Sequence, residues 1–295
     1  MKILLAVDSS AESDLAIKAV AARPWPHSTT VEVLNVVEPL YASEVPNLMG
    51  TLKQRANETV QGAAQRLRSS GIEASPLVLC GNTKSAIVEY ARKAGTDLIV
   101  VGSHSVTTGR QFLHGSVARA VVRFAPCSVE IVRGDAGPGA MKILLATDGS
   151  QYSEAAARSV AVRPWPVGTE VRILSVADHH VRVSAVANRP HFDAQAMEKL
   201  EAEAMKRAQE AVMSAEKIII EGHLAVSGTV AVPPAAPREI ILNEASDWCA
   251  NLIVVGSHGH GGLSRLVLGS TSEAIATCAL CSVEVIRQEV NPAML

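Results

Sequence analysis

The sequence predicts two α/β domains in tandem, each built on a doubly wound parallel sheet with helices on both faces. The first observation is an internal repeat along almost the whole chain, and a repeat of this length is a duplicated domain rather than a solenoid unit. The second observation is that strand-like and helix-like stretches alternate within each copy. The anchors of the repeat are residues 1–10 and 141–150, 23–26 and 163–166, 100–104 and 254–258, and 125–130 and 279–284.

The first copy opens with an apolar strand over Lys2–Val7. Ser9–Glu12 has the spacing of a capping box, and it predicts a helix through Ala22 that Pro24 and Pro26 stop. Further strands are predicted over Thr30–Val36, Ser75–Leu79, Asp97–Val101 and Ser128–Arg133, and further helices over Leu48–Ser70, ended by Gly71, and over Lys84–Ala94 and Ser116–Phe124.

The second copy follows the same order and carries about fourteen extra residues. We expect these residues in loop expansions on the ligand side, at Asp178–Ala196, before a long helix over Met197–Ala215, and at Thr229–Ala235. The glycine-rich stretch between the copies predicts a first domain over 1–134, a linker over 135–140 and a second domain over 141–288.

Composition narrows the classes of function. The chain of 295 residues is 48% hydrophobic, so each copy can bury a core. A net charge of −2 and an aromatic content of 3% argue against a nucleic-acid surface, so a phosphate ligand would have to be held by backbone donors. The N-terminal apolar run is too short for a signal peptide, no stretch could span a bilayer, and five cysteines fit a reducing compartment. We expect a soluble cytoplasmic protein.

The stretch Val254–Ser272 has the pattern of an anion site. It leaves a buried strand, crosses a glycine-rich loop and enters a helix at Gly269-Ser270, whose N–H groups would face an anion. Gly256 and Gly259 are expected to take positive φ and to let a ligand approach the backbone. The spacing of Gly, two residues, Gly, nine residues and Gly-Ser differs from both the GxGxxG fingerprint and the GxxxxGK[ST] loop.

With this spacing the chain resembles the universal stress protein family, in its ATP-binding branch, and the resemblance covers nearly the whole chain twice. It implies two Rossmann-like domains of the adenine nucleotide alpha hydrolase-like type, each a five-stranded parallel sheet of order 3-2-1-4-5. It also implies ATP, with or without Mg, as the ligand.

The resemblance assigns ligand-binding positions in the second copy. Asp148 would accept hydrogen bonds from a ribose hydroxyl, although an aspartate there can also cap the helix. Val176 would meet the adenine edge, or be plain core, and Arg265 could reach a terminal phosphate or be solvated. The remaining positions, which line the adenosine pocket or bind phosphate, are Ala146, Gly256, Gly259, Gly269, Ser270, Thr271 and Ser272.

The first copy keeps most of this pattern. Its matching positions are Ala6, Asp8, Val36, Gly102, Gly115 and Ser116, with Arg110 in the variable part of the loop. Ser105 departs from the family because it stands where the second copy has Gly259. If that position needs positive φ, Ser105 is strained or the loop takes another path. The first site is therefore the doubtful one.

Histidines and cysteines suggest weaker alternatives. His104, His114, His258, His260, His179-His180 and His191 lie in or near the loops without the ligand spacing of a metal site, so we assign none. Cys278 and Cys281 have CxxC spacing but no second pair, and Cys127 occupies the equivalent point alone, so a redox role is not favoured.

The last strand of each copy, Ser128–Arg133 and Ser282–Arg287, alternates as a half-buried edge strand does. In the resembled family this strand joins two domains edge to edge. We expect the two halves to pair as a pseudo-dimer, with further homo-oligomers; the alternative is two independent domains on a linker.

The resemblance implies a cytoplasmic ATP-binding regulator or sensor in stress adaptation, with slow ATP hydrolysis at most and no assigned catalytic residue. Two alternatives stay open. One is a nucleotide-dependent hydrolase or transferase of related fold, and the other is an interaction scaffold that has lost nucleotide binding.

Overall fold

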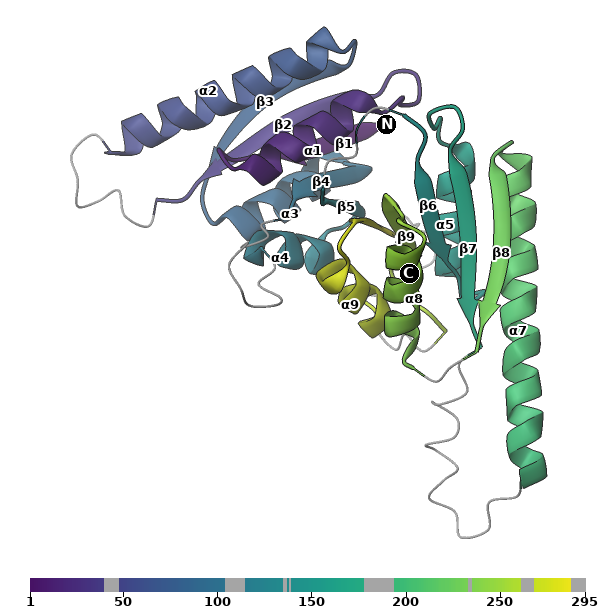
Figure 1. Ribbon diagram of the computed structural model, residues 1–295. Coiled ribbons are helices and arrows are strands. Elements are labelled where there is room, and N and C mark those ends of the chain that lie inside the picture. The colour runs from purple at the N-terminus through teal and green to yellow at the C-terminus, as the bar shows by residue number, and fades with distance from the viewer. Residues whose placement is uncertain are drawn as a thin grey trace.

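A computed structural model describes residues 1–39, 48–103, 115–134, 137, 139–177, 194–232, 235–260 and 268–287. Over these ranges the chain has an α/β fold in which all strands join one ten-stranded sheet, with helices on both faces (Figure 1). The strand order is β3-β2-β1-β4-β5-β10-β9-β6-β7-β8. The α/β class and the tandem organisation predicted from the repeat are confirmed.

The first half holds five strands and four helices within the described ranges. Its strands are β1 (Lys2–Ala6), β2 (Thr30–Val37), β3 (Glu73–Cys80), β4 (Leu98–Gly102) and β5 (Ser128–Val132). Its helices are α1 (Ala11–Ala22), α2 (Leu48–Ser69), α3 (Thr83–Ala94) and α4 (Ser116–Phe124).

The second half repeats this succession. Its strands are β6 (Lys142–Ala146), β7 (Glu170–Val176), β8 (Ala225–Ala231), β9 (Leu252–Gly256) and β10 (Ser282–Ile286). Its helices are α5 (Gln151–Val162), α7 (Ala194–Glu221), α8 (Pro237–Asp247) and α9 (Ser270–Cys278).

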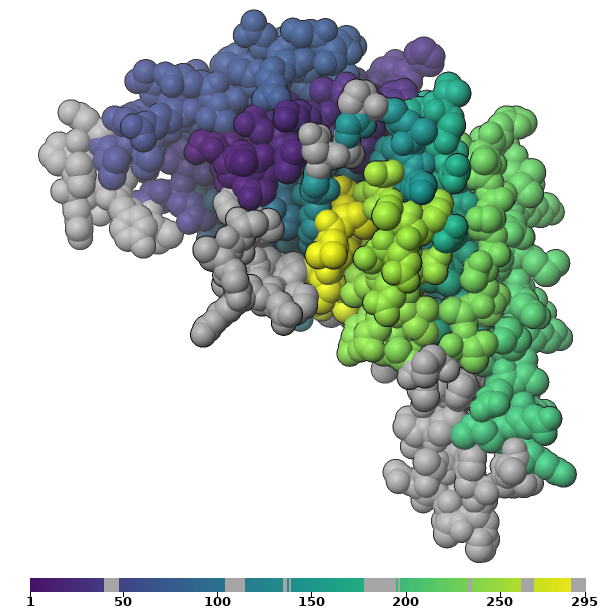
Figure 2. All heavy atoms as spheres, in the orientation of Figure 1, coloured from purple at the N-terminus to yellow at the C-terminus, as the bar shows by residue number. Residues whose placement is uncertain are grey.

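Strands are parallel within each half, and the order in each half, read in its own strand count, is 3-2-1-4-5. The halves meet where β5 and β10 pair antiparallel. Figure 2 shows the first half, in purple and blue, in contact with the second half, in teal to yellow. A sheet that runs through the junction fixes the relative position of the two halves.

Alternation along the strands sends neighbouring apolar side chains to opposite faces. On one face a single cluster of buried residues spans both halves and includes Ile87 of α3, Val121 of α4, Ile241 of α8 and Ile275 of α9. On the other face each half has its own cluster, under α1 and α2 in the first half and under α5 and α7 in the second. The core on the first of these faces is therefore shared by the halves. None of the helices in the described ranges is long and apolar enough to cross a membrane.

Two local predictions need correction. The N-cap of α1 is Ser10 rather than Ser9, because the Ser10 side chain accepts the N–H of Ser13. The extra residues of the second copy are also not confined to loops. The long helix α7 has 28 residues where α2 has 22, and strand β8 occupies part of the stretch predicted as an expanded loop at Thr229–Ala235. An amphipathic pattern can extend a helix at little cost, so part of an insertion is absorbed there.

Candidate functional site

A cavity of about 500 Å³ opens at the carboxyl ends of β1 and β4 in the first half. This is the edge of a parallel sheet where ligands of open α/β folds bind. The six residues that the sequence singles out in the first copy all line it: Ala6, Asp8, Val36, Gly102, Gly115 and Ser116. Residues far apart in the sequence are thus brought to one wall because β1, β2, β4 and α4 converge there.

The cavity also has lining residues that the sequence reasoning missed. Polar groups are added by Ser10, the N-cap of α1, by Ser13 in its first turn, by Asn35 of β2 and by Thr83 at the start of α3. Asn35 Nδ2 donates to the carbonyl of Val7 at 2.8 Å, which fixes the end of β1 beside β2. The apolar part of the wall comes from Leu34, Ile87, Val101, Val117 and Ala118. Asn35 alternates with core residues of its strand, and this is the only signal that could have singled it out.

Asp8 holds the start of α1, which is one of the two roles considered for this aspartate. Its Oδ1 accepts the backbone N–H of Ser10 at 2.9 Å and the hydroxyl of Ser13 at 2.7 Å, and the Ser10 hydroxyl also donates to it. The N–H of Asp8 donates to Ser13 Oγ at 2.9 Å. Asp8 therefore organises the start of α1, and it remains exposed on the cavity wall.

Two helix N-termini border the cavity. Helix α4 begins after Gly115, which offers no side-chain cap, so N–H groups of its first turn are left for other acceptors. Helix α3 begins after Asn82, and the N–H of Thr83 donates to Glu38 Oε1 at 2.8 Å. That hydrogen bond lowers the pKa of the Glu38 carboxyl from its ordinary value of 4.5. The N-terminus of α3 is thus bound by the carboxylate of Glu38, and the N-terminus of α4 faces the cavity.

In the second half the glycine loop folds back onto the aspartate. Asp148 Oδ1 accepts the N–H of Ser150 at 3.0 Å, and Oδ2 accepts the N–H of His260 at 3.2 Å. His260 Nε2 also lies 2.8 Å from the carbonyl oxygen of Asp148. Both carboxylate oxygens therefore contact backbone of the protein itself. His260 was not predicted to contact Asp148.

The expected positive φ at Gly256 and Gly259 is wrong. Neither glycine has positive φ, whereas nearby Gly149 does, at 77°. Gly256 is needed because a Cβ there would lie 2.6 Å from the backbone carbon of Tyr152, and Gly102 stands against Glu12 in the same way, with 2.5 Å to its carbonyl oxygen. These two glycines let a helix approach the end of the strand.

Gly259 is required for a different contact. A Cβ on Gly259 would lie 2.5 Å from Asp148 Oδ2. The first copy has Ser105 at the equivalent place. Ser105, Arg110 and Arg265 lie outside the described residues, as do His104, His114, His179, His180 and His191.

The start of α9 is anchored to the end of β9. Gly269 is the N-cap, and its N–H donates to the carbonyl of Ser257 at 2.9 Å. The buried Ser272 donates its hydroxyl to the carbonyl of Gly256 at 2.6 Å, so this side chain ties helix to strand. Ser270 is exposed and Thr271 is half-buried. Of the remaining predicted positions in the second half, Ala146 is buried and Val176 packs against the shared core.

The alternative chemistries gain no support from the described residues. His258 is buried against Tyr152, with ring centroids 4.9 Å apart, and its Nδ1 lies 3.1 Å from Ser257 Oγ. No group of three or more metal-ligating side chains forms within the described ranges. The five cysteines are free thiols, and burial raises the pKa of the Cys127 thiol to about 12.

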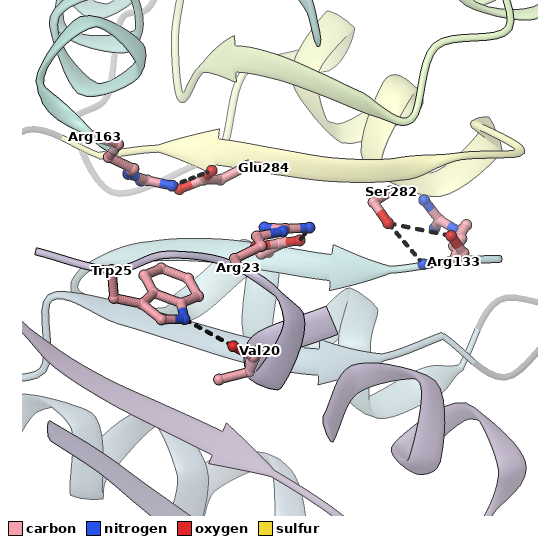
Figure 3. A network of polar contacts seen from close by, with 8 residues as sticks. Val20, Arg23, Trp25, Arg133, Arg163, Ser282 and Glu284 are labelled. Carbon is pink, nitrogen blue, oxygen red and sulfur yellow. Dashed lines mark hydrogen bonds and ion pairs between the residues drawn. The ribbon is translucent and has the colours of Figure 1, made fainter. Parts of the chain in front are cut away.

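The junction between the halves holds a set of buried charges that the sequence reasoning also missed. Arg23 donates to both carboxylate oxygens of Glu130 at 2.7 and 2.6 Å, and Arg163 pairs with Glu284 in the same bidentate way (Figure 3). Both arginines belong to the repeated Arg-Pro-Trp-Pro motif. The recurrence of that motif together with a glutamate at the same place in each last strand was the available signal.

Comparisons with known proteins agree with this architecture. A model of the universal stress protein family matches residues 1–133 and 140–287. A universal stress protein of Mycolicibacterium smegmatis is 26% identical over 298 residues, covering 97% of this chain and 96% of that protein. One from Mycobacterium tuberculosis is 28% identical over 301 residues, covering 97% of each.

Among solved structures, a universal stress protein from Archaeoglobus fulgidus matches with a TM-score of 0.69 and 20% identity, covering 97% of this chain and 98% of that chain. The likeness in structure extends over both halves, as the family match does. The chain therefore belongs to the universal stress protein family and carries the family's domain twice.

Proposed function

We propose that this protein binds ATP in the crevice at the carboxyl ends of its strands and acts as a nucleotide-dependent regulator or sensor in stress adaptation in the cytoplasm. The observation that carries the proposal is the cavity of about 500 Å³ in the first half, which is lined by all six residues that the family resemblance implies there. Its volume lies in the range of small-molecule sites.

The lining is suited to the three parts of ATP. Leu34, Val36 and Ile87 offer an apolar wall for a purine ring. Asp8 offers a carboxylate for ribose hydroxyls, and the N-terminus of α4, at Gly115 and Ser116, offers backbone donors for phosphates. The apolar wall on β2, the carboxylate after β1 and the helix N-terminus after β4 follow the order of these strands in the sheet. This order supports a nucleotide over a small anion.

Among the described residues the polar lining consists of hydroxyls, an amide and the carboxylate of Asp8. Neutral hydrogen-bonding groups around an apolar wall are typical of recognition, so a binding role is favoured over turnover. A regulator needs a ligand-dependent change, and the shared sheet and shared core give a route from either half to the other.

In the second half ATP would have to displace the protein's own contacts. The Asp148 carboxylate is held by the N–H groups of Ser150 and His260. A ribose hydroxyl that reaches Asp148 would compete with the N–H of His260 for Oδ2, and this competition lowers the net gain from binding.

The proposal is tested by denaturing the purified full-length protein, identifying any released nucleotide, and titrating nucleotide-free protein with ATP. Asp8→Ala and Asp148→Ala form a matched pair, and Asp247→Ala, at an exposed position of α8, is the control. We expect Asp8→Ala to weaken ATP binding about tenfold or more, because a charge-assisted hydrogen bond is lost. Asp148→Ala should weaken binding at the second site, and Asp247→Ala should have no effect.

Absence of released nucleotide, together with no response to ATP up to millimolar concentration, would reject the proposal and favour an interaction scaffold. Steady ATP turnover that Asp8→Ala abolishes would favour the hydrolase or transferase alternative instead.

A further inference from the structure

Arg133 and Arg287 occupy equivalent places, directly after the last strand of each half, and each reaches into the other half. The Arg287 guanidinium donates through Nη2 to the carbonyls of Val122 and Arg123 in the last turn of α4, both at 3.0 Å. The Arg133 guanidinium donates to the carbonyl of Ala276 in the last turn of α9. The contacts are reciprocal: each half supplies the arginine that caps the other half's helix.

The backbone of both arginines is fixed by the opposite strand. The N–H of Arg133 donates to Ser282 Oγ at 3.0 Å, and that hydroxyl donates to the carbonyl of Arg133 at 3.2 Å (Figure 3). The N–H of Arg287 donates to Ser128 Oγ at 3.1 Å. Backbone and side chain thus both belong to the junction, so a movement of one strand is passed to the capped helix.

The capped carbonyls are ones that a helix leaves without partners at its end. In α4 the carbonyl of Val121 still accepts the N–H of Ala125, and in α9 that of Ile275 accepts the N–H of Ala279. The carbonyls that follow have no helical N–H four residues on, and the arginines donate to them. A positive charge there also interacts favourably with the negative end of the helix dipole.

This arrangement costs free energy, because the guanidinium groups are largely withdrawn from water. Burial lowers the pKa of Arg133 to about 10 and also lowers that of Arg287. Arg133 Nη1 and Arg287 Nε are buried without a hydrogen-bond partner in the described part of the chain. Helix capping alone could be achieved by water at an exposed end, so a buried arginine in both halves indicates that the position of the helix matters.

The capped helices are the ones whose other ends border the candidate sites. Helix α4 has nine residues, and its first turn lines the cavity of the first half through Ser116, Val117 and Ala118. Helix α9 also has nine residues, and Ser272 in its first turn is bound to Gly256. A helix this short moves as one rigid body, so fixing its last turn fixes its N-terminal N–H groups.

We propose that Arg287 and Arg133 are positioning residues that act across the junction: Arg287 of the second half sets the anion-facing helix of the first site, and Arg133 of the first half sets that of the second site. The inference rests on the proposed nucleotide function for its ligand. It predicts a crossed pattern, in which a substitution in one half weakens binding in the other.

The test is hydrogen–deuterium exchange of the full-length protein over a series of ATP concentrations, which reads the two sites separately in peptides covering 116–124 and 270–278. Arg287→Ala should raise the ATP dissociation constant read at 116–124 about fivefold and leave that at 270–278 unchanged. Arg133→Ala should do the reverse. Arg287→Lys, which keeps a charged donor, should recover part of the affinity, and thermal unfolding of each variant controls for loss of fold.

Effects on the variant's own half, equal effects on both halves, or no effect would overturn the inference. If the wild type shows no ATP-dependent protection, the proposed function fails, and exchange without nucleotide then decides the positioning role. The positioning role is supported if Arg287→Ala speeds exchange over 116–124 more than over 270–278, and if Arg133→Ala does the converse. An uncrossed pattern would reject it.

Discussion

Glu130 of β5 lies directly opposite Glu284 of β10 in the antiparallel pair that joins the two halves. Each glutamate is 1% exposed. Two like charges in this position would drive the strands apart. The contact is stable because Arg23 and Arg163 each bind the glutamate of their own half, and the charge of Glu130 also raises the pKa of Arg163, after the larger effect of Glu284. The two ion pairs therefore bury four charges that sum to zero.

The first prediction concerns this balance. Arg23→Leu leaves Glu130 buried without its partner and should lower the free energy of unfolding by about 3–5 kcal/mol, measured by urea denaturation. Adding Glu130→Leu should restore much of the loss, because an apolar pair of similar volume can replace a buried ion pair. Arg66→Leu is the matched control, since its pair with Asp14 is exposed, and it should cost at most about 1 kcal/mol. A double variant no more stable than Arg23→Leu would contradict this account.

The fold class could be predicted because it depends on local pattern. Strands such as Ile3–Ala6 are apolar on both faces, which is the pattern of a parallel sheet covered by helices, and the repeat shows that the pattern occurs twice. Helix α4 begins and ends as predicted, because Gly115 is its N-cap and the Ala125-Pro126 pair ends it.

The side-chain pairs could not be predicted, because their members are far apart in sequence. Arg23 and Glu130 are separated by 107 residues. Tyr90 donates to Glu32 at 2.7 Å in the first half, whereas at the equivalent place in the second half Arg172 donates to Glu244 at 2.6 Å. The same two elements are tied in both halves, but the acidic partner has moved from the strand to the helix.

The candidate site could be predicted only in part. Strand ends place Ala6, Asp8, Val36 and Gly102 at one edge, and this follows from topology alone. That His260 would contact Asp148 could not be predicted, because this depends on the path of a loop rather than on any period in the sequence.

The second prediction concerns pH. The N–H of Thr83 lowers the pKa of Glu38 in the folded state, so this carboxylate contributes stability that is present above its ordinary value of 4.5. The contribution is lost as pH falls from that value through the lowered one. Glu38→Gln keeps the acceptor oxygen and removes the charge. It should be less stable than the wild type by about 0.5 kcal/mol near neutral pH, and the difference should disappear in acid. An equal difference at all pH values would show that the charge is not the cause.

The third prediction concerns thiol reactivity. Cys80 and Cys249 are exposed, whereas burial raises the pKa of the Cys127 thiol to about 12 and also raises that of Cys281. The thiolate is the reactive form, so iodoacetamide at mildly alkaline pH should label Cys80 and Cys249 first in native protein, and Cys127 and Cys281 only after denaturation. Mass spectrometry of digested protein gives the order. Early labelling of Cys127 would mean that the sheet around β5 opens in solution.

The last prediction concerns the contact that closes the second site. His260 donates its N–H to Asp148 Oδ2 at 3.2 Å, and its ring lies against the Asp148 carbonyl at 2.8 Å. His260→Ala removes the ring contact and should release the loop, so that a ligand hydroxyl no longer competes with the protein for the carboxylate. We expect ATP to bind the second half about threefold more tightly, the gain from one hydrogen bond that need not be broken. Exchange over 270–278 reports this site, and exchange over 116–124 should not change. His27→Ala, at an exposed position of the first half, is the control. Weaker binding in His260→Ala would instead make His260 a ligand contact, and the closed loop would then be part of the binding site rather than its competitor.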